Sequence, residues 1–113
     1  MIHQLRIYEI FESNRKAFHD RFRDHAVPIM ARYGFHIRAM WECRNGDRLE
    51  FIYLLVWPDA ETLTGAWDSF MADDEWAAIK RRTAALHGDL VGDIQDRRLN
   101  LTDYSPAAPG LTG

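Results

Sequence analysis

Residues 35–57, FHIRAMWECRNGDRLEFIYLLVW, decide the fold of this chain. From Phe35 to Cys43 apolar and polar side chains alternate, which is typical of a strand with one face in water. The pair Asn45-Gly46 then favours the tight turn of a β-hairpin. The strand that follows, Leu49 to Trp57, ends in seven consecutive apolar residues. This segment therefore predicts an antiparallel hairpin in which one strand is buried on both faces.

The regions on either side of the hairpin predict further strands and helices. Ile2 to Phe11 alternates like a strand, and the apolar spacing from Ser13 to Tyr33 is that of a long helix. After the hairpin, one helical pattern begins at the cap residue Asp59 and a second begins at residues 73–74. A charged segment, Ile94 to Leu101, predicts the last strand. The order β-α-β-β-α-β, with the second helix split in two, predicts a ferredoxin-like α+β fold with a four-stranded antiparallel sheet and helices on one face.

Length and composition narrow the function classes. The 113 residues suit one domain, which we assign to residues 1–101, followed by a tail at residues 102–113. The net charge of -3 and the lack of a basic face argue against a nucleic acid as an obligate partner. Cys43 is the only cysteine, so an internal disulfide and a cysteine metal cluster are both excluded. Without a signal peptide or an apolar run of roughly 20 residues, we expect a cytoplasmic protein with no membrane insertion.

The apolar strand at residues 51–57 also bears on the oligomeric state. In the predicted fold it is a central strand, and the helices of one chain cover only one side of the sheet. We expect a second copy of the sheet to cover the other side and form a dimeric α/β barrel, because two-fold dimers are the commonest oligomers. The alternative is that the tail or the split helix wraps over this face.

His25 lies within the apolar stripe of the predicted first helix, between Phe22 and Ile29, and Pro28 follows it. A buried imidazole needs a partner, since an unpaired buried polar group costs about 1–3 kcal/mol. A proline inside a helix removes a backbone hydrogen bond and kinks the helix. We expect His25 on the sheet-facing side, as a general base or a haem ligand. The alternative is a core histidine bonded to a strand carbonyl or a tyrosine hydroxyl.

The first strand carries three polar side chains on one face. Gln4, Arg6 and Tyr8 are spaced two residues apart, so they point the same way. If Leu5 and Ile7 face the helices, the three polar side chains face the interior of the barrel. An arginine and a phenol in a mostly apolar cavity can bind a carboxylate, a carbonyl or an enolate.

Arg6, Tyr8 and His25 are the catalytic residues that this pattern predicts. The alternative for Arg6 is an ion pair with Glu42 or Glu50 of another strand that stabilises the sheet.

The remaining candidates are large side chains of the strands. We expect Trp41, Tyr53 and Trp57, together with Gln4, to line the barrel and contact its ligand. The chain lacks an HExxH motif, a Walker loop and a GxGxxG motif, so we predict no metal site and no resident cofactor, haem at His25 being the one alternative.

Several short motifs, taken in order, resemble the NIPSNAP family of the dimeric α/β barrel superfamily. They are Arg6-x-Tyr8, HAVPIMARYGF at residues 25–35, Trp41, YLLVWPD at 53–59, DDEW at 73–76 and TDYSP at 102–106. In DDEW, Asp74 stands where the family commonly has proline. The resemblance covers nearly the whole chain, looks like a compact bacterial version of the family, and implies a ferredoxin-like fold and a homodimer. It implies little chemistry, because superfamily relatives include cofactor-independent monooxygenases, haem-degrading enzymes and small isomerases.

Two functions therefore stay open at the level of sequence. The first is a barrel that binds a small hydrophobic molecule and acts as a cofactor-independent enzyme, monooxygenase- or isomerase-like. The second is a non-catalytic dimeric module for interaction or sensing, with a barrel filled by its own side chains.

Overall fold

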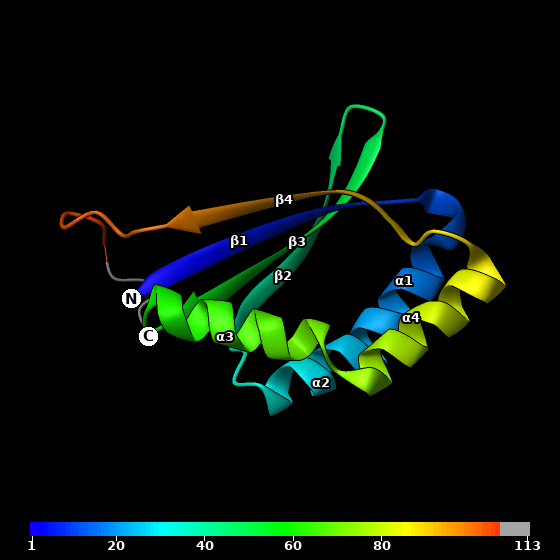
Figure 1. Cartoon of the computed structure of the whole chain (residues 1–113). Coiled ribbons are helices and arrows are strands. Elements are labelled where there is room, and N and C mark those ends of the chain that lie inside the picture. The colour runs from blue at the N-terminus through cyan, green and yellow to red at the C-terminus, as the bar shows by residue number, and fades with distance from the viewer. Residues whose placement is uncertain (107–113) are drawn as a thin grey trace.

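The computed structural model describes residues 1–106 and contains one antiparallel sheet with every helix on the same side of it (Figure 1). The strands lie in the order β2-β3-β1-β4 and comprise β1 (Ile2–Ile10), β2 (Ile37–Asn45), β3 (Arg48–Trp57) and β4 (Val91–Leu99). The helical segments are η1 (Glu12–Asn14), α1 (Arg15–Arg21), η2 (Phe22–Ala26), α2 (Val27–Arg32), α3 (Ala60–Met71) and α4 (Asp74–His87). The predicted ferredoxin-like α+β fold is confirmed, and β2 and β4 are its edge strands.

Local sequence signals set the ends of these elements. The side chain of Asp59 accepts a hydrogen bond from the Thr62 amide at 2.7 Å and caps α3. Asp73 accepts one from the Trp76 amide at 2.8 Å and caps α4, so the second helix is split at this residue. In the hairpin turn Gly46 has a φ of 64°, a conformation that glycine adopts without a steric penalty.

The first helix is irregular at the point where Pro28 disturbs it. Residues 22–26 form a π turn, and the Val27 amide donates to the Phe22 carbonyl five residues earlier. In a regular α-helix the ring of Pro28 would clash with the Asp24 carbonyl, and the wider turn relieves this clash.

The two faces of β1 are oriented opposite to the expectation. Tyr8 pairs with Phe51 of β3, and both side chains are buried in the core beneath the helices. Arg6, two residues earlier, lies on that same face. Leu5 and Ile7 point away from the helices, so the condition set for the barrel is not met, and Gln4, Arg6 and Tyr8 face the helices instead of the barrel interior. The hydrogen bonds made by the polar side chains of β1, described below, are the physical reason.

The helix-free side of the sheet, called here the open face, is apolar along β1 and β3. It carries Leu5, Ile7, Ile52, Leu54 and Val56, none of which belongs to the core beneath the helices. Asn100 and Leu101, which directly precede the predicted tail at residues 102–113, border a small hollow beside Leu54 at one end of this face. Residues 107–113 of that tail lie outside the described part of the chain. Within residues 1–106, no helix combines the length and the apolar character needed to cross a bilayer.

Candidate functional site

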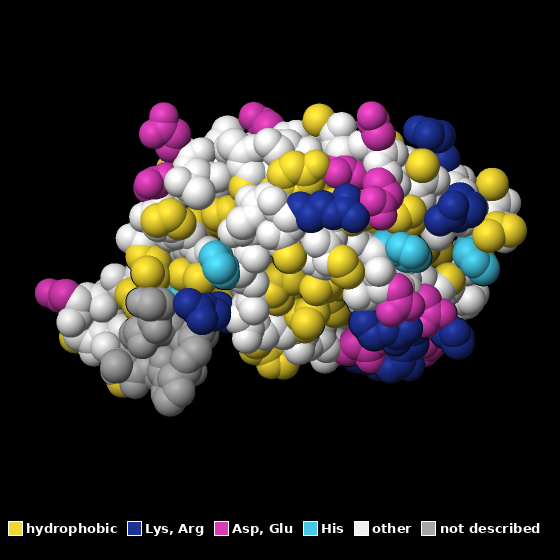
Figure 2. All heavy atoms as spheres, turned by 90° about the horizontal axis from the view of Figure 1, so that it is seen from below, with side chains coloured by type: hydrophobic (Ala, Val, Ile, Leu, Met, Phe, Trp, Pro, Cys, Tyr) yellow, Lys and Arg dark blue, Asp and Glu magenta, His cyan; other side chains and the backbone are white. Residues whose placement is uncertain are grey.

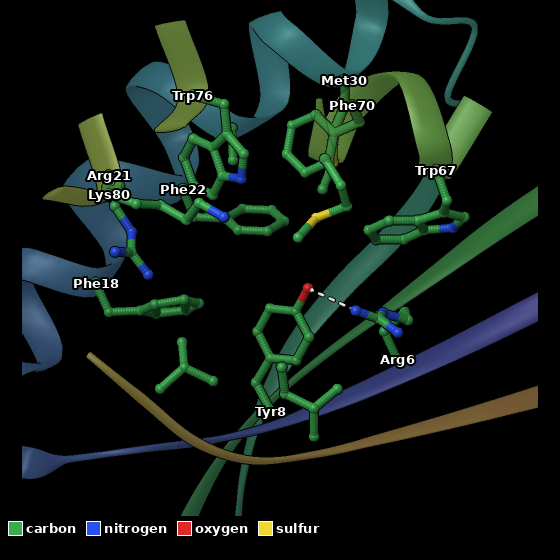
Figure 3. A pocket seen from close by; sticks show the side chains of 14 residues that line it. Arg6, Tyr8, Phe18, Arg21, Phe22, Met30, Trp67, Phe70, Trp76 and Lys80 are labelled. Carbon is green, nitrogen blue, oxygen red and sulfur yellow. Dashed lines mark hydrogen bonds between the residues drawn. The ribbon is translucent and has the colours of Figure 1, made fainter. Parts of the chain in front are cut away.

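A cavity of about 190 Å³ lies between the sheet and the helices (Figure 3). β1 and β4 supply one wall, and α1, η2, α3 and α4 supply most of the other. Its walls are largely aromatic, with three cations among them, and the lining comprises Arg6, Tyr8, Phe18, Arg21, Phe22, Ala26, Met30, Trp67, Phe70, Met71, Trp76, Lys80, Val91 and Ile94. Within residues 1–106, no carboxylate and no imidazole lines this cavity.

Tyr8 presents its hydroxyl group to the cavity. The hydroxyl lies 2.6 Å from that of Tyr53, which is fully buried. Burial raises the pKa of Tyr53 well above its ordinary value, because it disfavours the phenolate. Tyr53 therefore keeps its proton, and we assign this proton to the bond with the Tyr8 oxygen, 2.6 Å away. This assignment leaves the Tyr8 proton available to a ligand.

Arg6 lies beside Tyr8 with part of its hydrogen-bonding capacity unused. Its Nη2 donates to the Tyr8 hydroxyl at 3.3 Å, and its Nη1 lies 3.4 Å from Oδ2 of Asp96 on β4. The guanidinium stacks on the Trp67 ring, 4.3 Å from its centroid. Its Nε is buried without a hydrogen-bond partner in the described chain. Because Nε has almost no accessible surface, a ligand in the cavity would meet Arg6 through its terminal nitrogens.

Gln4 holds the neighbours of Arg6 in place through its hydrogen bonds. Its side chain is 1% exposed, and its carbonyl oxygen accepts the indole N–H groups of Trp57 and Trp67, each at 2.9 Å. Its amide group donates to both carboxylate oxygens of Asp96 at 3.1 and 3.2 Å. Gln4 does not line the cavity, so its predicted contact with a ligand is replaced by a positioning role: it fixes the two groups that flank Arg6.

Two further cations lie on the other side of the cavity. Arg21 and Lys80 both lie over the Trp76 ring, 5.4 and 5.7 Å from its centroid. Arg21 donates to the Thr83 hydroxyl at 3.0 Å, and burial lowers the pKa of its guanidinium. Among residues 1–106, neither cation has an ion-pair partner.

His25 does not meet Arg6 and Tyr8, so the expectation that it faces the sheet is wrong. With Ala17 and Arg21 it forms a stripe at i, i+4 spacing that turns toward α4. There it lines a separate surface hollow of about 150 Å³ together with charged side chains, Asp20 and Asp24 among them, and His87. These charged neighbours do not fit an apolar porphyrin, so the haem alternative finds no support at this residue. In residues 1–106, no group of three or more His, Cys, Asp or Glu side chains is placed to hold a metal ion.

The remaining predicted ligand contacts are distributed differently. Tyr53 and Trp57 are 0% and 1% exposed, belong to the core and do not line the cavity. Trp41 is 48% exposed on the edge strand β2 and borders a shallower surface groove of about 470 Å³ between β2 and the first helix, beside Met40 and Val27. Figure 2 views the helical side and shows apolar atoms near its middle beside a cluster of mixed charges.

The expected ion pair between Arg6 and a neighbouring glutamate is also corrected. Arg6 pairs with Asp96, whereas Glu42 binds Arg15 and Glu50 binds Arg48. Two features explain the difference: Glu42 lies on β2, which is not adjacent to β1, and Glu50 pairs with Glu9 on the opposite face of the sheet from Arg6.

A pH-dependent prediction concerns Glu42, which contacts Arg15 at 3.0 Å and Nε2 of His19 at 2.6 Å. These hydrogen bonds lower the pKa of Glu42 to about 2. Because the pKa is lowered in the folded state, the stabilisation is present at neutral pH and is lost as the pH falls from about 5 toward 2. For this surface cluster we expect Glu42→Gln to lower the free energy of unfolding by about 0.5–1 kcal/mol at pH 7. Denaturant titrations should show the difference shrinking toward pH 2, and Glu61→Gln, at an exposed site, should show no such trend.

The sequence pattern does not predict several of the cavity residues. Trp67 and Trp76 pack with the core, and each also forms part of the cavity wall. Arg21 and Lys80 are the two cavity cations that the pattern does not predict. A usable signal exists for Lys80, because it follows Trp76 by four residues on one helix and so shares its face.

Comparison with solved structures agrees with this fold. A NIPSNAP domain protein from Burkholderia xenovorans has a TM-score of 0.77 and 18% identity, over 95% of this chain and 100% of that one. A NIPSNAP family protein from Agrobacterium tumefaciens has a TM-score of 0.78 and 20% identity, over 95% and 98%. SnoaB, a cofactor-independent oxygenase from Streptomyces nogalater, has a TM-score of 0.55 and 16% identity, over 94% and 97%. At these identities the likeness concerns the fold alone.

Sequence comparison gives the family. Among curated proteins, none matches this chain. The NIPSNAP family model matches residues 3–106, nearly the whole chain and every element of the sheet and its helices. The chain therefore belongs to the NIPSNAP family.

Proposed function

We propose that this protein binds a small, hydrophobic, oxygen-bearing molecule in the cavity between the sheet and the helices. The observation that carries the proposal is the meeting of the Tyr8 hydroxyl and the Arg6 guanidinium in a mostly apolar cavity. Both groups are donors, so they suit a carboxylate, an enolate, a phenolate or a carbonyl oxygen. The aromatic walls suit a flat apolar body.

The size of the cavity limits the ligand. An engineered apolar cavity of about 150 Å³ binds benzene, and drug-sized ligands occupy about 300–1,000 Å³. A cavity of about 190 Å³ therefore suits a molecule of one or two rings.

Binding is favoured over catalysis by the groups that are present. Proton abstraction near neutral pH normally uses an imidazole or a carboxylate, and residues 1–106 place neither in the cavity wall. Cofactor-independent oxygenation is a second candidate, supported by the fold shared with an oxygenase.

The test is a ligand panel of one- and two-ring carboxylates, phenols and neutral analogues. Trp67 and Trp76 line the cavity, so quenching of tryptophan fluorescence reports binding directly. A ligand at about 100 times its Kd adds about 2.7 kcal/mol to the free energy of unfolding, which raises Tm by roughly 10 °C. We expect Arg6→Gln to weaken binding about tenfold or more, because it removes a charge-assisted hydrogen bond.

The matched control is Arg38→Gln, an exposed arginine on the edge strand β2 that is outside the cavity. It should leave the affinity unchanged. A panel that gives neither quenching nor a shift in Tm, or equal weakening by both variants, would rule out this site.

A further inference from the structure

We propose that the ligand of this cavity is a dianion, a short flat molecule with an acidic group at each end. This inference rests on the proposed function and names the class of molecule that the same site takes. It follows from the placement of the three cations, which divide into two groups.

The first group is at the end of the cavity nearest β1. Arg6 lies there against Trp67 and Tyr8 and directs Nη2 toward the Tyr8 hydroxyl (Figure 3). Asp96 contacts Arg6 but is not part of the cavity wall, so the two donors on the cavity side stay available to an acidic group.

The second group is at the other end. Figure 3 shows Arg21 and Lys80 on the opposite side from Arg6, with the rings of Phe22 and Tyr8 between them. Both are half-buried at the Trp76 ring, and within residues 1–106 Arg21 donates to a neutral partner, the Thr83 hydroxyl. A half-buried cation without an ion-pair partner attracts an anion more strongly than a fully hydrated cation does, so this end also favours an anion.

The cations at the two ends of the cavity differ in their counter-charges. Among residues 1–106, Arg6 pairs with Asp96, whereas Arg21 and Lys80 have no ion-pair partner. A monoanion at Arg6 leaves the other end of the cavity uncompensated. A rigid aromatic dicarboxylate places one carboxylate at each end and its ring between the aromatic walls.

The experiment compares probes that differ by one carboxylate, measured by calorimetry with the full chain at low ionic strength. The pairs are benzoate with benzene-1,4-dicarboxylate, and 2-naphthoate with naphthalene-2,6-dicarboxylate. In at least one pair the dicarboxylate should bind about tenfold or more tightly, the effect of one added charge-assisted hydrogen bond. Added salt should reduce this gain, because screening weakens the second ion pair.

Variants assign the gain to the second group of cations. Lys80→Gln, and separately Arg21→Gln, should lower the affinity for the dicarboxylate and leave that for the monocarboxylate within about twofold. Arg82→Gln, an exposed arginine on the same helix outside the cavity, is the matched control and should change neither affinity.

The outcomes separate the two proposals. Equal affinity within both pairs, or a gain that survives in Lys80→Gln and Arg21→Gln, overturns the dianion while leaving the cavity a binding site. Failure of all four probes together with the full panel overturns the binding site and the dianion with it.

Discussion

Replacing Gln4 with leucine is expected to lower the free energy of unfolding by about 3–5 kcal/mol, a large share of the total of about 5–15 kcal/mol for a typical domain. The Gln4 carbonyl is the acceptor for the indole N–H groups of Trp57 and Trp67, each at 2.9 Å. Leucine leaves both donors buried without this partner, at about 1–3 kcal/mol each. Asp96 also loses the two hydrogen bonds from the Gln4 amide. Denaturant unfolding followed by circular dichroism measures the change.

Gln95→Leu is the matched control, since Gln95 is a half-buried glutamine on the open face whose recorded partner is Arg97. It should cost less than about 1 kcal/mol. A double-mutant cycle with Trp67→Phe isolates one of the bonds: Gln4→Leu should cost less once the Trp67 indole is gone. If Gln4→Leu lowers the free energy of unfolding equally in the wild-type and the Trp67→Phe proteins, the bond to Trp67 adds nothing to stability.

Replacing Ile52 with aspartate is expected to convert a dimer into a monomer. We propose that a second copy of this chain covers the open face, because Leu5, Ile7 and Ile52 are only half-buried there, whereas the neighbouring Leu54 and Val56 are already buried within the chain. Ile52 lies on the central strand β3 and pairs with Ile7 of β1. A charge placed there would be buried in the interface without a partner, at a cost of several kcal/mol. Light scattering after gel filtration, at micromolar concentration, gives the mass of each species.

The control for this experiment is Leu86→Asp, which makes the same kind of change at a residue that is 72% exposed on α4. It should leave the dimer intact, and Ile7→Asp should dissociate it as Ile52→Asp does. A wild-type protein that is monomeric at these concentrations would contradict the second copy as the cover.

The sequence predicts the order of the elements well, because the relevant signals are local. The turn at Asn45-Gly46 and the caps at Asp59 and Asp73 act within a few residues, and each marks an observed boundary. Boundaries without such a signal are less accurate. The last strand runs from Val91 to Leu99 rather than from Ile94 to Leu101.

Local sequence patterns do not predict which side of the sheet each side chain of β1 faces. Leu5 and Ile7 are the apolar residues in the middle of β1, yet the polar Gln4 lies under the helices. Its partners Trp57 and Trp67 are 53 and 63 residues away, and no pattern within β1 reveals them. Burial of a polar group depends on whether the fold supplies partners, and only the tertiary structure shows this.

For the same reason, only two of the three predicted catalytic residues lie together. Arg6 and Tyr8 meet because they share a strand face, which spacing alone predicts. The prediction that His25 faces the sheet is wrong because the helix is not regular. The π turn at residues 22–26 interrupts the spacing of 3.6 residues per turn on which that prediction depends. The cations at Arg21 and Lys80 meet at Trp76 through helix packing, which spacing within one helix does not predict.

The position of β3 in the sheet also affects whether this chain aggregates after it unfolds. Residues 51–57 form an uncharged, β-prone segment without proline, a composition that promotes cross-β aggregation once it is exposed. In the native sheet β1 and β2 pair with both of its edges, and charged side chains on the outer strands, such as Arg38 and Arg97, discourage further strand addition. Unfolding removes this protection from the whole segment at once. We therefore expect destabilised variants to be lost as insoluble protein rather than to persist as unfolded soluble chains.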